Sequence, residues 1–199
     1  DGQLYVESMD IIEYLDDAFG GDRLVPKDDE QILADAEALT QWGEELHRSI
    51  RFVTFRWGLG RLGKLNNKEE SKLKRLLAQS NDDEKLVAFY SGYDSSSIDE
   101  SIYYDHLNHL YSAFAKLDSR LSDGRAFLAG DRLTMADVIW AMKILRLKEC
   151  GYPFELEHPK VNEWYVRIFK RPAFQSGVMG KHRGLNRVFR FKASIEKIF

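Results

Sequence analysis

Two histidines and one cysteine are the first side chains whose types suggest chemistry in this sequence. His106 and His109 are three residues apart, a spacing that places both on one face of a helix, where two imidazoles can bind one metal ion. No third ligand accompanies them, so we expect histidines that pack between helices or lie at the surface, and no metal site. Cys150 is the only cysteine, which excludes an intrachain disulfide and a zinc site built from several cysteines. It follows an apolar stretch, so we expect a buried structural thiol.

A second pattern is typical of the start of a helix: Leu133-Thr134-Met135-Ala136-Asp137-Val138. Thr134 at the N-cap can accept a hydrogen bond from the backbone N–H of Asp137, and the Asp137 carboxylate can accept one from the N–H of Thr134. Leu133 and Val138 occupy the positions of a hydrophobic staple. Such a cap contributes about 1 kcal/mol. The pattern therefore predicts a structural capping box for Thr134 and Asp137, with no catalytic role.

The composition limits the class of protein. The chain has 199 residues, of which 44% are apolar and 31% charged, values typical of a globular protein and not of a disordered one. No apolar run approaches the roughly 20 residues that cross a bilayer, and no signal peptide opens the chain, so we expect a cytoplasmic protein. Its 29 basic and 32 acidic residues give a net charge of −3, which argues against a dedicated nucleic-acid-binding protein.

Helical periodicity dominates the elements that must position these residues, because apolar side chains recur every three or four positions between recognisable end signals. The expected helices cover residues 8–19, 29–60, 97–121 and 134–150, followed by one that begins at Pro159 and a short turn from Arg171-Pro172. A polar stretch, 66–96, separates the second and third, and residues 185–199 suit an amphipathic tail helix. The sequence predicts an all-α domain.

The first residues differ from the rest, because Gln3-Leu4-Tyr5-Val6 alternates as a short strand does. No other segment alternates convincingly, and a lone strand leaves its backbone hydrogen-bonding groups without partners. We therefore expect a sheet-forming segment before Asp1. The alternative is a frayed terminal turn.

Two segments resemble motifs of one protein family, the cytosolic glutathione transferases. Residues 127–137, Phe-Leu-Ala-Gly-Asp-Arg-Leu-Thr-Met-Ala-Asp, resemble the capping-box motif of its helical C-terminal domain. Residues 4–15 resemble the last strand and third helix of its thioredoxin-like N-terminal domain. The resemblance implies that residues 1–20 end a thioredoxin-like α/β domain that binds glutathione, that 21–28 are a linker, and that 29–199 form a helical bundle of the C-terminal type.

The resemblance also implies a glutathione site. In the family a Glu-Ser dipeptide binds the γ-glutamyl end of glutathione, and it matches Glu7 and Ser8 here. A hydroxyl and the free N–H groups of a helix start can hold the γ-glutamyl carboxylate, and Glu7 offers a charge partner for the α-ammonium group. Without the family, Ser8 is a plain N-cap and Glu7 a surface charge. The catalytic Tyr, Ser or Cys of the family is expected before Asp1, so the catalytic residue is unknown.

The electrophile pocket of the family draws on the later part of the first long helix and on the C-terminal tail. The matching positions are Arg48, Arg51, Phe52, Phe55 and Arg56. Aromatic and cationic side chains suit a flat, anionic or aromatic co-substrate, because arginine can pair with a carboxylate or phenolate. The alternative places the two phenylalanines in the core and the arginines in solvent.

Three functions remain open at this point. The leading one is a glutathione transferase that joins or exchanges the glutathione thiol with a small aromatic electrophile, without a metal. The run Glu7-Ser8-Met9-Asp10-Ile11 also resembles bacterial glutaredoxins of the same two-domain fold, which predicts disulfide reduction. A non-catalytic relative is the third, with the insertion 66–96 as a surface for partners.

Charge is unevenly distributed along the chain. Residues 1–30 contain ten acids and two bases, a net of −8, and residues 164–199 contain nine bases and one acid, a net of +8. A basic tail can bind nucleic acid or anionic lipid. We favour instead a tail that packs against the acidic front of its own chain or of a dimer partner, or attracts an anionic substrate. The resemblance implies a homodimer.

Overall fold

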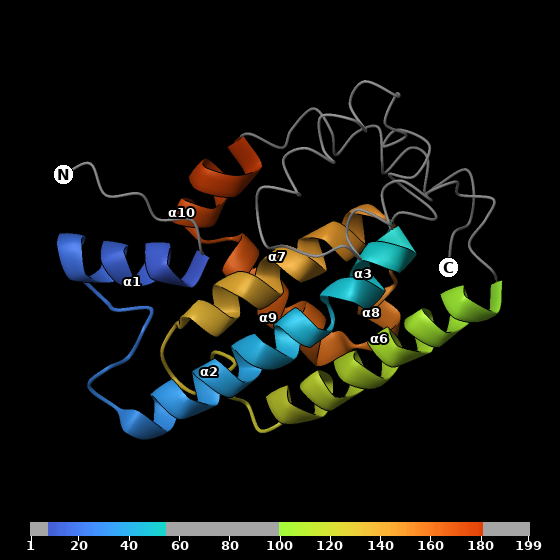
Figure 1. The fold of residues 1–199 in the computed structure, drawn as a ribbon, viewed down its shortest axis with the longest axis horizontal. Coiled ribbons are helices and arrows are strands. Elements are labelled where there is room, and N and C mark those ends of the chain that lie inside the picture. The colour runs from blue at the N-terminus through green and yellow to red at the C-terminus, as the bar shows by residue number, and fades with distance from the viewer. Residues whose placement is uncertain (1–7, 55–99, 181–199) are drawn as a thin grey trace, which may run out of the picture.

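The computed structural model describes residues 8–54 and 100–180, which form a bundle of helices (Figure 1). Apart from one β-bridge between Phe127 and Gly130, every regular element in these ranges is helical. The elements are α1 (Ser8–Phe19), α2 (Glu30–Glu45), α3 (His47–Thr54), α6 (Glu100–Leu121), α7 (Met135–Glu149), α8 (Phe154–Glu157), α9 (Pro159–Phe169), α10 (Pro172–Phe174) and the π-helical η2 (Gln175–Met179). The expected all-α bundle is confirmed for this part of the chain.

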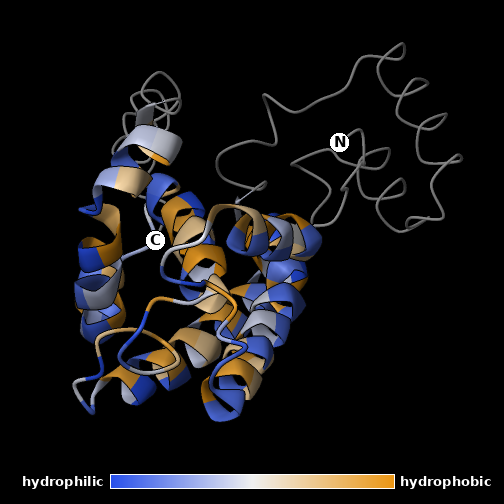
Figure 2. Cartoon of the chain, turned by 90° about the vertical axis from the view of Figure 1, so that its left-hand side faces the viewer, coloured by the Kyte–Doolittle hydropathy of each residue, from blue (hydrophilic) through white to orange (hydrophobic). Residues whose placement is uncertain are grey.

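Helix α7 contributes most to the core. It packs against α2, α3 and α9, while α6 packs against α3 and α9. Trp140 and Ile144 of α7 are fully buried, and the Trp140 indole Nε1–H donates to the carbonyl of Leu39 on α2 at 2.9 Å. The hydrophobic sides of the helices are turned inward and the charged sides outward (Figure 2). A helix buried by three neighbours must be apolar nearly all round, as the sequence of α7 is.

Several helix ends lie within a few residues of the positions expected from the sequence. α1 has the predicted bounds, and α6 ends at Leu121, before a turn at Gly124 with a φ of +87° that favours glycine. α7 lies between the N-cap Thr134 and the C-cap Cys150. α9 begins at Pro159, where the missing N–H of proline costs no helical hydrogen bond.

The prediction of a single long helix over residues 29–60 is wrong in one respect. The Asp29 carboxylate caps its start, accepting from the backbone N–H groups of Gln31 and Ile32 at 3.1 and 3.0 Å. However, α2 ends at Glu45 and α3 begins at His47. The break falls at Leu46, which is buried, so apolar spacing continues across it and the sequence pattern hides it. The predicted strand at residues 3–6, the insertion 66–96 and the tail helix 185–199 lie outside the described residues.

The linker between α1 and α2 is hydrogen-bonded both to α1 and to the start of α7. The Asp16 carboxylate on α1 accepts a hydrogen bond from the backbone N–H of Val25 at 2.7 Å. The N–H of Met135, at the start of α7, donates to the Leu24 carbonyl at 2.9 Å. These bonds hold α1 at one end of the bundle (Figure 1). Within residues 8–54 and 100–180, no helix is both long enough and apolar enough to span a membrane.

Candidate functional site

Helix α1 begins at Ser8. The family resemblance implies that this residue binds glutathione. The first backbone N–H groups of a helix have no partner within it, and the helix dipole is positive at this end, so the position can hold a carboxylate. The first turn also contains Asp10. The side chains of Glu7 and Ser8 lie outside the described residues, so their contacts with a ligand remain a prediction.

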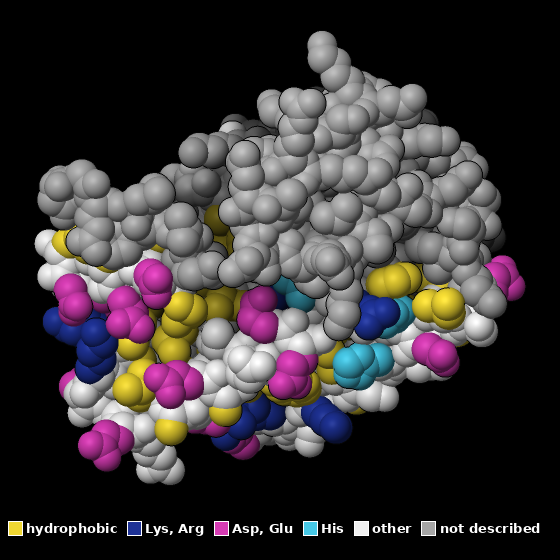
Figure 3. Space-filling view, viewed as in Figure 1, with side chains coloured by type: hydrophobic (Ala, Val, Ile, Leu, Met, Phe, Trp, Pro, Cys, Tyr) yellow, Lys and Arg dark blue, Asp and Glu magenta, His cyan; other side chains and the backbone are white. Residues whose placement is uncertain are grey.

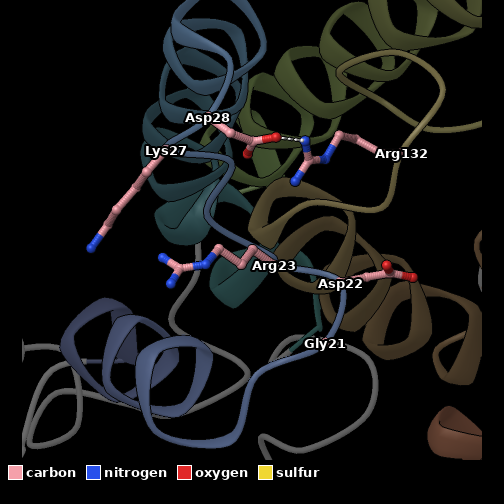
Figure 4. Close-up of a pocket in the computed structure, with 6 residues that line it drawn as sticks. All are labelled: Gly21, Asp22, Arg23, Lys27, Asp28 and Arg132. Carbon is pink, nitrogen blue, oxygen red and sulfur yellow. Dashed lines mark hydrogen bonds and ion pairs between the residues drawn. The ribbon is translucent and has the colours of Figure 1, made fainter.

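The other end of α1 is fixed by charges around the linker (Figure 4). A pocket of about 650 Å³ is lined there by Gly21, Asp22, Arg23, Lys27, Asp28 and Arg132. Arg132 donates to the Asp28 carboxylate at 2.8 Å, and this pair lowers the pKa of Asp28. Arg23 pairs with Asp17 of α1 at 2.9 Å. Because these guanidinium groups face carboxylates, we interpret the pocket as a junction between α1 and the bundle and not as an anion site.

Two of the expected electrophile-pocket residues lie on the side of α3 that faces α6. The Phe52 ring stacks on the His106 imidazole with ring centroids 4.4 Å apart. The Arg48 guanidinium also lies over the Phe52 ring, with its central carbon 5.7 Å from the ring centroid. Histidine and basic side chains gather where α3 meets α6 (Figure 3). Arg48 and Phe52 therefore belong to the contact between these helices.

Ser49 connects the two histidines that the sequence singled out. Its buried Oγ lies 2.9 Å from His106 Nδ1 and 3.1 Å from His109 Nδ1. Partial burial lowers the pKa of His106, and the nearby Arg48 and His109 lower it further. Among the described residues no group of three or more metal-binding side chains occurs. Through Ser49 the two histidines connect α6 to α3.

Arg51 lies on a different side of α3 from Arg48 and Phe52, and it acts on His47 together with Lys143 and Arg146 of α7. The evidence for this position is the pKa of His47, on which Arg51 acts. Burial and the positive charges of Lys143, Arg51 and Arg146 lower this pKa, whereas the carboxylate of Glu44 raises it. Lys143 donates to a Glu44 carboxylate oxygen at 3.0 Å, and His47 Nδ1 lies 3.6 Å from the other oxygen. The charged groups that act on His47 are thus three cations and one carboxylate.

The five pocket candidates are therefore divided. Arg48 and Phe52 face α6, Arg51 lies with the cations of α7, and Phe55 and Arg56 lie outside the described residues. Sequence reasoning missed Lys143 and Arg146. The sequence shows both residues on α7, three positions apart and near Lys148 and Glu149 at the end of that helix. In the structure Lys143 is paired with Glu44, and Arg146 donates to the Thr54 hydroxyl.

Thr134 and Asp137 form the expected capping box at the start of α7. The Asp137 carboxylate is fully buried and accepts from the N–H groups of Leu128 and Thr134, each at 2.9 Å, and from the Trp164 indole at 3.0 Å. The Thr134 hydroxyl also donates to it, at 3.1 Å. Burial raises the pKa of Asp137, although these hydrogen bonds act in the opposite direction. The carboxylate joins α7, α9 and the preceding loop, which is a structural role.

Comparison with solved structures identifies the fold. The β-etherase LigF from Sphingobium sp. strain SYK-6 aligns with a TM-score of 0.71 and 20% identity, over 88% of this chain and 74% of that one. A glutathione S-transferase from Rhodospirillum rubrum F11 aligns with a TM-score of 0.60 and 23% identity, over 88% of this chain and 65% of that one. The chain thus spans about two thirds of the second protein. No curated protein sequence matches it significantly.

The sequence itself carries a family match. Residues 73–167 match the model described as "Glutathione S-transferase, C-terminal domain". The match includes the whole of α6 and α7, the loop and capping box between them, and most of α9. Residues 73–167 are therefore similar to the C-terminal domain of glutathione S-transferases, and the chain shares its fold with the two solved structures.

Proposed function

We propose that the protein is a glutathione transferase, which joins the glutathione thiol to a small aromatic electrophile. Glutathione binds at the start of α1 through Glu7 and Ser8, and the electrophile binds along α3 and the residues that follow it, beside Arg48, Arg51 and Phe52. The observation that carries the proposal is that α1 begins at Ser8, in a chain that is similar to the C-terminal domain of glutathione S-transferases. A helix start at that residue supplies the N–H groups that a carboxylate needs.

The chemistry assigned to the complex is nucleophilic substitution. The thiol of glutathione loses its proton to solvent, and the thiolate sulfur forms a bond to an electrophilic carbon. The leaving group departs with the bonding electron pair. Binding the γ-glutamyl carboxylate at the positive end of α1 fixes the tripeptide, so that attack takes place within one complex. In line with the family, we expect a cytoplasmic homodimer that needs no metal.

Calorimetric titration of the full-length protein with glutathione tests the proposal. We expect saturable binding in the wild type and at least tenfold weaker binding in Ser8→Ala, because the loss of one hydrogen bond to a charged group costs about 1.5–3 kcal/mol. Ser112→Ala, at an exposed position on α6, is the matched control and keeps wild-type affinity. The absence of heat at millimolar glutathione contradicts the proposal.

Turnover separates a transferase from the alternatives. The wild type is assayed with chloronitrobenzenes, with an aryl ether because one structural neighbour is a β-etherase, and with a glutathione mixed disulfide. We expect thioether formation with at least one of the first two substrate classes. Activity with the disulfide alone supports the glutaredoxin-like alternative. Binding without turnover of any of them supports a non-catalytic relative.

A further inference from the structure

We propose that Ser49, His106 and His109 form a proton-sensitive switch between α3 and α6. The switch holds the two helices together while the imidazoles carry at most one proton more than in their neutral forms, and it weakens the contact when they carry two. The inference does not depend on the proposed function. It bears on the whole of α3, because Phe52 of that helix stacks on His106 and Arg48 lies over the Phe52 ring.

The three polar groups meet at one oxygen. The Oγ of Ser49 is buried on α3, 2.9 Å from His106 Nδ1 and 3.1 Å from His109 Nδ1. The histidines are three positions apart on α6, so both rings reach the same point on α3, with which α6 is in contact. The two Nδ1 atoms are no farther apart than the sum of these distances. Ionisation of one imidazole must therefore affect the other.

The number of protons in this cluster determines its hydrogen bonds. A neutral imidazole has one N–H donor and one acceptor nitrogen, and a serine hydroxyl has one proton. Both contacts form when one histidine donates from Nδ1 to Oγ and the hydroxyl donates to Nδ1 of the other. A first additional proton is compatible with this pattern, because it binds to Nε2 of the donating histidine and leaves both bonds in place.

A second additional proton is not compatible with the pattern. It must bind to the Nδ1 atom that accepts from the Ser49 hydroxyl, so the hydroxyl loses that acceptor. Two cationic imidazoles then face one oxygen at a partly buried boundary, where like charges repel each other more strongly than in bulk water. The contact between α3 and α6 is therefore weaker in the doubly charged state.

The surroundings indicate which histidine stays neutral longer. His106 is half-buried, whereas His109 is exposed. Burial lowers the pKa of His106 most, the charges of Arg48 on α3 and His109 on α6 lower it further, and Asp105 on α6 raises it. Within the described residues, the charges that act on His106 thus come from α3 and α6. We assign the accepting Nδ1 to His106 and the donating Nδ1 to His109, which binds the first proton.

Nitrogen NMR of the imidazole rings tests this assignment, because the chemical shifts of Nδ1 and Nε2 distinguish the two tautomers and the charged form. The full-length wild type is titrated from neutral to mildly acidic pH. We expect His106 to start with its proton on Nε2 and His109 on Nδ1, and His106 to be the second of the two to become charged. The reverse order, or simultaneous titration, overturns the proposal.

Two substitutions test the coupling between the histidines. His109→Gln removes the neighbouring charge but keeps an N–H donor for Oγ, so the pH midpoint of the His106 titration should rise by about half a unit or more. Ser49→Ala removes the hydroxyl that stabilises neutral His106 and should also raise the midpoint. Asn108→Ala, at an exposed position between the two histidines, is the matched control and leaves it unchanged. An unchanged midpoint in all three variants excludes the switch.

Amide hydrogen exchange shows whether the contact between the helices weakens. The separated state takes up the second proton more readily, so it becomes more populated as the pH falls. We expect protection factors in α3, corrected for the intrinsic effect of pH on exchange, to fall by about tenfold between pH 7 and 5. His106→Gln should abolish this fall, because glutamine takes up no proton. His47→Gln, on α3 but outside the cluster, is the control and should keep it.

The remaining outcomes distinguish the switch from general acid unfolding. Circular dichroism confirms that each variant is folded, and the titration of the wild type needs no variant. An equal loss of protection in α3 and α7 overturns the switch, because the whole bundle then opens. A fall that persists in His106→Gln also overturns it, and a fall that is lost in His47→Gln assigns the acid response to His47 instead.

Discussion

His158 is the histidine whose burial has the clearest energetic consequence. It is 3% exposed at the start of α9, and its Nε2 lies 3.0 Å from the hydroxyl of Tyr152. Its Nδ1 is buried without a hydrogen-bond partner among the described residues. Burial lowers the pKa of His158, although Asp118 and Glu157 act in the opposite direction. The folded protein therefore keeps this imidazole neutral at pH values where the unfolded chain already binds a proton.

The expected outcome is a loss of stability in mild acid. Since the folded pKa of His158 lies below its unfolded value of about 6.5, the stabilisation is present above pH 6.5 and is lost as the pH falls toward the folded pKa. Each such group contributes up to about 1.4 kcal/mol of unfolding free energy per pH unit. Urea unfolding between pH 8 and 5 measures the slope. It should be shallower in His158→Gln, and equal slopes in the two proteins contradict the assignment.

Residue-scale prediction from the sequence succeeded where the partners are close along the chain. The capping box was accessible because Thr134 and Asp137 are three positions apart. The other partners of Asp137, Leu128 and Trp164, are 9 and 27 residues away, and no local pattern connects them. Arg146 of α7 has the same limitation, since it and its partner Thr54 are 92 residues apart. Burial and helix packing had to be known before these contacts could be assigned.

At the scale of elements, one hydroxyl connects α3 and α6. Ser49 has a single hydroxyl proton but two Nδ1 neighbours, His106 and His109. One imidazole must accept that proton, and the other must carry its own proton on Nδ1 and donate to Oγ. The two histidines therefore adopt complementary protonation patterns on one helix, and both depend on the same buried oxygen.

Removing that oxygen should weaken the contact between α3 and α6. We expect Ser49→Ala to lower the free energy of unfolding by about 1–2 kcal/mol, because two partly buried nitrogens lose their partner. His106→Ala and the double variant complete a cycle, with an expected coupling of about 1 kcal/mol. Ser112→Ala, on an exposed part of α6, should change stability by less than about 0.5 kcal/mol. Strict additivity of the two single changes would exclude a direct bond.

The elements also show which signals the sequence carries. Proline, glycine and capping residues marked the ends of α1, α6, α7 and α9, because each signal acts on its own backbone. The break at Leu46 had no such signal, since the buried leucine fits the apolar stripe on both sides of it. The division of the pocket candidates follows from the same limitation. A stripe drawn on one helix does not reveal which neighbour each side chain faces.

For the whole molecule, the attachment of α1 to the bundle matters most, because the proposed function places glutathione on α1 and the electrophile on the bundle. The ion pairs around the linker are exposed, and such pairs contribute little individually. The hydrogen bond from the Val25 N–H to the Asp16 carboxylate is different, because Val25 is buried. We infer that Asp16 holds the junction closed.

Trypsin can test this inference directly, because Arg23 and Lys27 are cleavage sites within the linker. Asp16→Ala leaves a buried N–H without its partner, at a cost of about 1–3 kcal/mol. Local opening should then be about tenfold more frequent, and cleavage in the linker correspondingly faster. The exposed Asp22 provides the control, and Asp22→Asn should be cut at the wild-type rate. Equal rates for Asp16→Ala and the wild type would assign the junction to other contacts.

The bonds of Asp137 also bear on the order in which the chain folds. Two of its partners close loops of only 3 and 9 residues, whereas the bond between Trp140 and Leu39 closes one of 101. Short loops cost less entropy to close, and contacts of this kind form early. The segment around α7 can therefore collapse on one carboxylate before α2 docks, so we expect Asp137 to influence the speed of folding as well as the stability of the folded bundle.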